Sequence, residues 1–183
     1  METFRYPSIL ASAFLDISFD TGLIRQFLAT IDYANEKMVL RERSQQSGDA
    51  LREQLHGHIV GEVPFVLSAT HMMMARGSMN GREDLTFFVD SGLASPARIA
   101  VPPQTLEYLG IPEPEKKIDP TSVGGGGGAW ASALFPIDTL GLGSILQKDH
   151  QGEYGSRQTS SYWEMGFIQD GLISHGFLRQ YAS

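Results

Sequence analysis

The sequence predicts a mostly β protein with one short helix near its C-terminal end. Apolar runs broken by single polar residues fill residues 63–79 and 82–89, and this pattern is typical of strands. Asn80-Gly81 joins the two runs and is a strong hairpin signal, because both residues tolerate the positive φ of a type I′ turn. The helix is expected from about His175, after a last apolar strand.

Composition limits the classes of function. The 183 residues fit one ordinary domain, or one domain and a fragment. The net charge of −7 and the pI of about 5.1 argue against nucleic acid or an anionic membrane as a partner. The chain contains no cysteine, which excludes disulfide frameworks and thiolate metal sites.

No stretch approaches the length of a membrane span. Ala11-Ser12-Ala13 has the small residues of a signal-peptide cleavage site, but too few apolar residues precede it. We therefore expect a structural strand in this region, and a cytoplasmic location by default.

The chain divides into three segments. Residues 1–43 are apolar and patterned. Residues 44–62 are polar, contain Ser47-Gly48-Asp49 and predict a linker with one short helix around residues 50–55. Residues 63–183 form a second patterned region of the size of a small β domain.

Within this second region the order of elements can be predicted. Asp90 ends the return strand of the Asn80-Gly81 hairpin and is followed at once by Ser91-Gly92. A short helix is expected over residues 104–109, between prolines. A run of five glycines then lies between possible strands: Gly124, Gly125, Gly126, Gly127 and Gly128.

A short internal repeat links the two patterned regions. Gly-Leu-Ile occurs at residues 22–24 and again at 171–173, and Arg-Gln-aromatic occurs at 25–27 and at 179–181. In this comparison five additional residues, "SHGFL", separate the two motifs in the second copy. The repeat predicts that the first region is the end of the kind of unit that the second region contains whole.

Three stretches resemble aspartic proteases of the retropepsin type. "FFVDSGLAS" resembles the hydrophobic-hydrophobic-Asp-Ser/Thr-Gly signature, and the glycine run lies where that family has its flap. "DGLISHGFLRQY" resembles the strand-to-helix motif that closes a retropepsin lobe, here with Leu172, Ile173 and Ser174. The chain is similar to bacterial two-lobed, retropepsin-like aspartyl proteases over nearly its whole length.

The resemblance implies a closed β-barrel-like lobe over residues 63–183, a linker over 44–62, and the closing strands of a preceding lobe over 1–43. It implies peptide-bond hydrolysis by a water activated between two aspartates, of which Asp90 is one. Ser91 and Gly92 would shape the active-site loop, and the five glycines would form the flap. The substrate would be a peptide or protein, with no metal and no organic cofactor.

The second aspartate is the open question. One lobe supplies one aspartate, so activity would need a homodimer in which Asp90 meets its twofold mate, or the missing lobe. Asp20-Thr21-Gly22 matches the signature, but a segment like the closing motif follows it, so we interpret Asp20 as a turn residue and keep an Asp20/Asp90 pair as the minor alternative. A non-catalytic peptide-binding or assembly module and an inactive fragment are the other hypotheses.

The closing motif departs from the family pattern at two positions. Ser174 stands where a glycine is usual, and Gly176 stands where an acid or amide is often found. Other candidate sites are weak. His56 and His58 lack further metal ligands nearby, and no Lys-Ser/Thr follows the glycine run, which therefore is not a P-loop.

Overall fold

The computed structural model describes residues 2–5, 21–68, 72–93, 95–115, 117–123, 129–155 and 168–181. The chain forms two compact units, one of Met1–Ile59 with Arg179–Ser183 and one of Val60–Leu178. The predicted boundaries at residues 43 and 62 stay predictions. No helix of the described residues is both long enough and apolar enough to cross a membrane.

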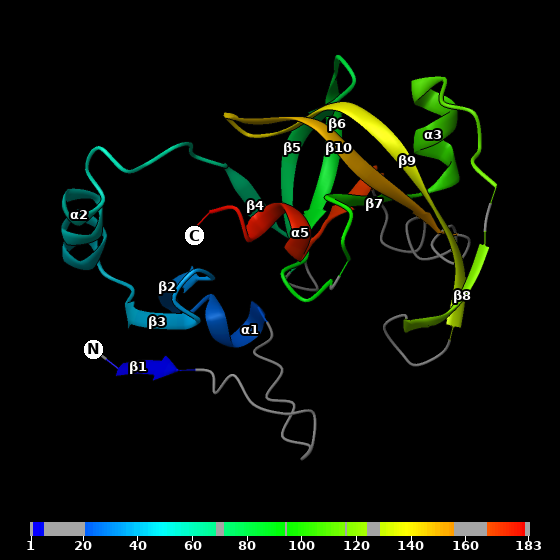
Figure 1. Ribbon diagram of the computed structural model, residues 1–183. Coiled ribbons are helices and arrows are strands. Elements are labelled where there is room, and N and C mark those ends of the chain that lie inside the picture. Colours follow the sequence, from blue (N-terminus) through cyan, green and yellow to red (C-terminus); the bar gives the residue numbers. More distant parts are fainter. Residues whose placement is uncertain are drawn as a thin grey trace. The chain divides into compact units, whose positions relative to one another are not determined.

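The first unit contains a three-stranded antiparallel sheet in the order β1-β3-β2 and two helices (Figure 1). Strands β2 and β3 form a hairpin whose turn contains Glu36 with φ 53°. The elements are β1 (Glu2–Arg5), α1 (Thr21–Ile24), β2 (Phe27–Asp32), β3 (Lys37–Glu42) and α2 (Gln45–Gln54).

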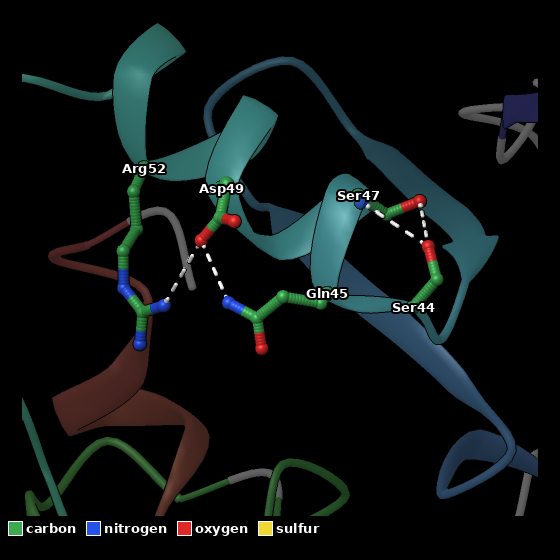
Figure 2. A network of polar contacts seen from close by, with 5 residues as sticks. All are labelled: Ser44, Gln45, Ser47, Asp49 and Arg52. Carbon is green, nitrogen blue, oxygen red and sulfur yellow. Dashed lines mark hydrogen bonds and ion pairs between the residues drawn. The ribbon is translucent and has the colours of Figure 1, made fainter.

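Helix α2 is the predicted linker helix, and it begins earlier than the sequence indicated. Ser44 caps it, because the Ser44 hydroxyl accepts a hydrogen bond from the backbone N–H of Ser47 at 3.2 Å. Figure 2 shows this cap and, one turn further on, Asp49 between Gln45 and Arg52. The helix buries no residue completely, so its cap and polar side chains contribute much of what holds it.

The second unit is an eight-stranded sheet in the order β4-β5-β6-β11-β7-β10-β9-β8. An additional pairing of β5 with β9 closes the sheet on itself, which confirms the predicted barrel-like architecture. The elements are β4 (Phe65–Leu67), β5 (Met73–Met79), β6 (Arg82–Val89), β7 (Ile99–Val101), α3 (Pro103–Leu109), β8 (Lys117–Val123), β9 (Ala129–Leu142), β10 (Ile145–Gly155), β11 (Gly171–Ile173) and α5 (His175–Leu178).

The apolar core of this unit lies inside the closed sheet. In β6, Leu85 and Phe87 are buried and Thr86 between them is half-buried, as one face of a strand turned toward a core requires. Strand β7 is buried at all its positions, because it lies between β10 and β11. Fully buried side chains include Met79, Leu85, Phe87, Ile99, Val101, Ile137, Leu140, Ile173 and Phe177.

The predicted Asn-Gly hairpin is confirmed. Asn80 and Gly81 have φ of 48° and 82°, and β5 and β6 pair antiparallel on either side of them. The Asn80 side chain also accepts hydrogen bonds from the N–H groups of Asp138 (3.0 Å) and Thr139 (3.2 Å), so the hairpin tip is fixed to β9. Figure 1 shows the long β9–β10 hairpin that carries these two residues.

Residues 63–79 form two strands rather than one long strand. Strand β4 pairs antiparallel with β5, so the chain reverses direction between them. Ser68 makes this reversal possible, because its hydroxyl accepts from the N–H of Met72 and its N–H donates to the Met72 carbonyl.

Candidate active site

Asp90 lies immediately after β6, at the strand end that the sequence predicted. On one side of β6 runs β11, parallel to it, with Val89 opposite Ile173. The backbone N–H of Asp90 continues this ladder by donating to the Ile173 carbonyl oxygen at 2.9 Å. The closing motif and the aspartate loop, far apart in sequence, are therefore neighbours in the sheet.

The loop after Asp90 is arranged around its carboxylate. The N–H of Gly92 donates to Asp90 Oδ1 at 2.9 Å, and the N–H of Leu93 donates to the Asp90 carbonyl oxygen at 3.3 Å. A Cβ at Gly92 would lie 3.3 Å from Asp90 Oδ1, which is tight. Asp90 is half-buried, whereas Ser91 and Gly92 are exposed. The carboxylate is thus oriented by one backbone donor, the N–H of Gly92, in a loop that solvent reaches.

The closing motif folds as a strand followed by a helical turn, as predicted. Leu172 and Ile173 lie in β11, which also pairs antiparallel with β7. Ser174, fully buried, joins β11 to α5. Its N–H donates to the Arg98 carbonyl oxygen at 3.0 Å, and its hydroxyl donates to the Ala97 carbonyl oxygen. A buried hydroxyl is tolerated at this position because its hydrogen bonds are made.

The glycine at position 176 has a steric reason. A Cβ there would lie 2.6 Å from the Ala97 carbonyl oxygen and 2.9 Å from that of Ser95. A larger side chain such as an acid or amide would need the segment before β7 to move. The departure from the family pattern at Gly176 therefore fits the close packing of α5 against residues 95–97.

Two polar residues near the connection between β11 and α5 were not predicted from the sequence. The Arg98 guanidinium donates to the Gly176 carbonyl oxygen. Glu153 on β10 is buried, with 8% of its surface exposed, and accepts from the Ser95 hydroxyl at 2.6 Å. The sequence pattern that could have indicated Arg98 is a charged residue next to the apolar run Ile99–Val101. No local pattern indicates Glu153, because its partner Ser95 is distant in sequence.

Asp170 lies just before β11, opposite the middle of β6. Its carboxylate accepts from the N–H of Thr86 at 2.7 Å, and its carbonyl oxygen accepts from the Thr105 hydroxyl at 2.7 Å. Burial raises the pKa of Asp170, while the Thr86 hydrogen bond acts in the opposite direction. This aspartate fixes the start of the closing strand against β6 and α3.

Two sets of predicted site residues lie outside the described residues. One is the glycine run at 124–128, although β8 and β9, which pair antiparallel, lie directly before and after it. The other is Asp20. His56 and His58 are exposed, and within the described part of the chain no group of three or more potential metal ligands occurs.

The internal repeat has a different register from the one inferred from sequence. Residues 22–24 are helical, whereas residues 171–173 form a strand, so these Gly-Leu-Ile copies are not equivalent. The helices α1 and α5 match instead: "TGLIRQF" and "HGFLRQY" align without a gap, and each helix is followed by a turn. In this register Asp20 corresponds to Ser174, a residue of the closing motif.

No protein-family model matches the sequence, and no curated protein matches it. The crystal structure of a retropepsin-like aspartic protease from Rickettsia conorii is similar to the chain, with 15% sequence identity and a TM-score of 0.48. The similarity covers 66% of this chain and 88% of that one. The mostly β class and the closed barrel stand on the strand pairings of this chain itself.

Proposed function

We propose that this protein is an aspartic endopeptidase in which Asp90 is the acid/base carboxylate. The observation that carries the proposal is the position of Asp90: it follows a core strand directly, is joined to the closing strand through Ile173, and is oriented by the N–H of Gly92. A carboxylate held by a backbone donor in an accessible loop is suited to proton transfer with a substrate.

The proposed chemistry needs a second carboxylate close to Asp90. Two aspartates in contact cannot both ionise cheaply, so they share one proton. One then takes a proton from a water held between them, while the other gives a proton to the carbonyl oxygen of the peptide bond. The apparent pKa values of such a site belong to the pair.

We propose that a second copy of the chain supplies this carboxylate, its own Asp90, across a twofold axis. A homodimer with this symmetry puts the same loop on both sides of the axis. Exposed Ser91 would then be available for hydrogen bonding between the two loops, and the β8–β9 hairpin with its five glycines would close over an extended peptide.

Cleavage of an unfolded protein at acidic pH tests the proposal. The unmodified chain should cleave it and be inhibited by a statine-type peptide, and Asp90→Asn should abolish cleavage while the fold is retained. Asp149→Asn is the matched control, because Asp149 is exposed and its φ of 56° is one that asparagine tolerates. Equal cleavage by the Asp90→Asn protein would show that the site is wrongly assigned.

A mixing experiment identifies the source of the second aspartate. If two Asp90 residues form the site, refolding equal amounts of unmodified and Asp90→Asn chains together should leave about a quarter of the activity, because random pairing makes one dimer in four fully intact. An Asp20/Asp90 site within one chain would leave about half, and Asp20→Asn would then inactivate the protein. An inert protein that binds the statine-type peptide would favour the non-catalytic peptide-binding module.

A further inference from the structure

The loop that carries Asp90 is attached to the β11–α5 junction by backbone hydrogen bonds on both of its sides. The N–H of Asp90 donates to the Ile173 carbonyl oxygen at 2.9 Å, and the N–H of His175 donates to the Leu93 carbonyl oxygen at 3.1 Å. These two bonds flank Ser174 in the chain. The position of the junction therefore determines the position of the aspartate loop.

Ser174 holds the junction from inside. It is fully buried, and its hydroxyl both donates to the Ala97 carbonyl oxygen and accepts from the N–H of Gly176 at 3.0 Å. Its own N–H donates to the Arg98 carbonyl oxygen. A glycine or alanine here would leave the Gly176 N–H and the Ala97 carbonyl without this partner in a buried place, which is costly.

Arg98 is a second residue that holds the same junction. Its guanidinium donates to the Gly176 carbonyl oxygen on α5, while its backbone N–H donates to Gln151 on β10 at 2.9 Å. The residue is half-buried, and a hydrogen bond from a charged donor is stronger than one between neutral groups. Arg98 thus connects α5 to β10.

We propose that Ser174 and Arg98 are positioning residues that set the location of the Asp90 carboxylate through the β11–α5 junction. This inference rests on the proposed function for its catalytic consequence. A displacement of a reacting group by about 1 Å can lower a rate about a hundredfold, so small movements of the junction are sufficient. Neither residue is expected to touch the substrate.

Amide hydrogen exchange tests the structural part without any activity. In Ser174→Ala the N–H groups of Asp90 and His175 should exchange about tenfold faster, because the junction that holds them opens more easily. The N–H groups of Asp138 and Thr139, which are bound to Asn80, should not change. Ser144→Ala is the matched control, because the Ser144 hydroxyl, at the β9–β10 turn, makes hydrogen bonds with the backbone N–H and carbonyl of Glu62. A uniform increase at all four amides, or none, would overturn the inference.

Kinetics test the catalytic part. Ser174→Ala and Arg98→Met should lower kcat about ten- to a hundredfold with little change in KM, because substrate contacts are retained. Arg98→Lys keeps a charged donor and should recover part of kcat. An unchanged kcat, or no recovery with lysine, would contradict the proposal. If the unmodified chain does not cleave at all, the proposed function fails, and the exchange result still shows whether Ser174 holds the loop.

Discussion

The Asp170 carboxylate accepts a hydrogen bond from the N–H of Thr86 at 2.7 Å, and the Asp170 N–H donates to the Thr86 carbonyl oxygen at 2.8 Å. This reciprocal pair aligns the start of β11 with β6, because Asp170 lies four residues before Ser174 and Thr86 lies four residues before Asp90. The alignment of the candidate site therefore depends on a half-buried carboxyl group whose ionisation has a cost.

The first prediction concerns pH and Asp170. Burial raises its pKa above the ordinary value of 3.8, so the folded protein binds this proton more tightly than the unfolded chain does. The contribution of Asp170 to the free energy of unfolding is therefore full at low pH and is lost as pH rises through the folded pKa. Asp170→Asn should remove this decrease while keeping an acceptor for the Thr86 N–H.

Denaturant unfolding at a series of acidic to neutral pH values measures the effect. Trp130 and Trp163 both lie in the sequence of the second unit, so tryptophan fluorescence follows that unit. Asp149→Asn, an exposed change of the same type, should leave the pH dependence as it is in the unmodified protein. If the free energy of unfolding changed with pH equally in the unmodified and Asp170→Asn proteins, the prediction would be wrong.

The sequence predicted those features that depend on neighbouring residues. Asn80-Gly81 specifies its turn by its own φ preferences, and the strand before Asp90 is visible as an apolar run. The reversal at Ser68 was missed because apolar residues continue on both sides of it, and the polar group that makes the turn is a single hydroxyl.

The site was predictable only in part, for a related reason. Asp90 and the closing motif each have a local pattern, whereas the bond between Arg98 and Gly176 exists only once β7 and α5 have packed together. The register of the internal repeat was wrong because Gly-Leu-Ile has no strong preference for helix or strand, and its surroundings determine which it adopts.

The second prediction concerns the hairpin tip. Asn80→Ala should destabilise the second unit by about 2 kcal/mol, because it removes the acceptor for two N–H groups and puts alanine at a positive φ. Asn80→Asp keeps both the acceptor and the tolerance of this conformation, so it should cost less. Fluorescence-detected unfolding compares the two, and equal losses would show that the amide acceptor is unimportant.

The third prediction compares two glycine-to-alanine substitutions that should change stability in opposite directions. Gly176→Ala should destabilise the protein by about 1–3 kcal/mol, because its Cβ meets backbone oxygens at 2.6 and 2.9 Å. Gly48→Ala places its Cβ where no atom lies within 4 Å, inside α2, and should stabilise that helix by about 1 kcal/mol. Amide exchange in α5 and α2 measures each effect locally. If both substitutions stabilised the protein, or both destabilised it, the result would contradict the packing described for α5.

The fourth prediction concerns Tyr108 on α3. Its hydroxyl donates to Asp84 Oδ2 at 2.9 Å, and this hydrogen bond raises the pKa of Tyr108 above 10.0. Asp84→Asn should lower that pKa. The titration of Tyr108 is obtained by subtracting the tyrosinate absorbance of a Tyr108→Phe protein from that of the matching protein with Tyr108. Because the raised pKa favours the protonated folded state, the free energy of unfolding should fall as pH rises through it, and less steeply in Asp84→Asn. If Asp84→Asn left the pKa of Tyr108 unchanged, the prediction would be wrong.

The pairing of β5 with β9 has a consequence for the time at which the barrel can form. Gly77 lies opposite Leu142 and Met79 opposite Leu140, so closure joins segments that leave the ribosome well apart in time. The β5–β6 hairpin can form early, because its turn is local. Strand β4 pairs with the first half of β5, but until residue 142 has been synthesised the second half, Gly77–Met79, has no strand beside it on that edge. We expect the nascent chain to be prone to aggregation during this interval.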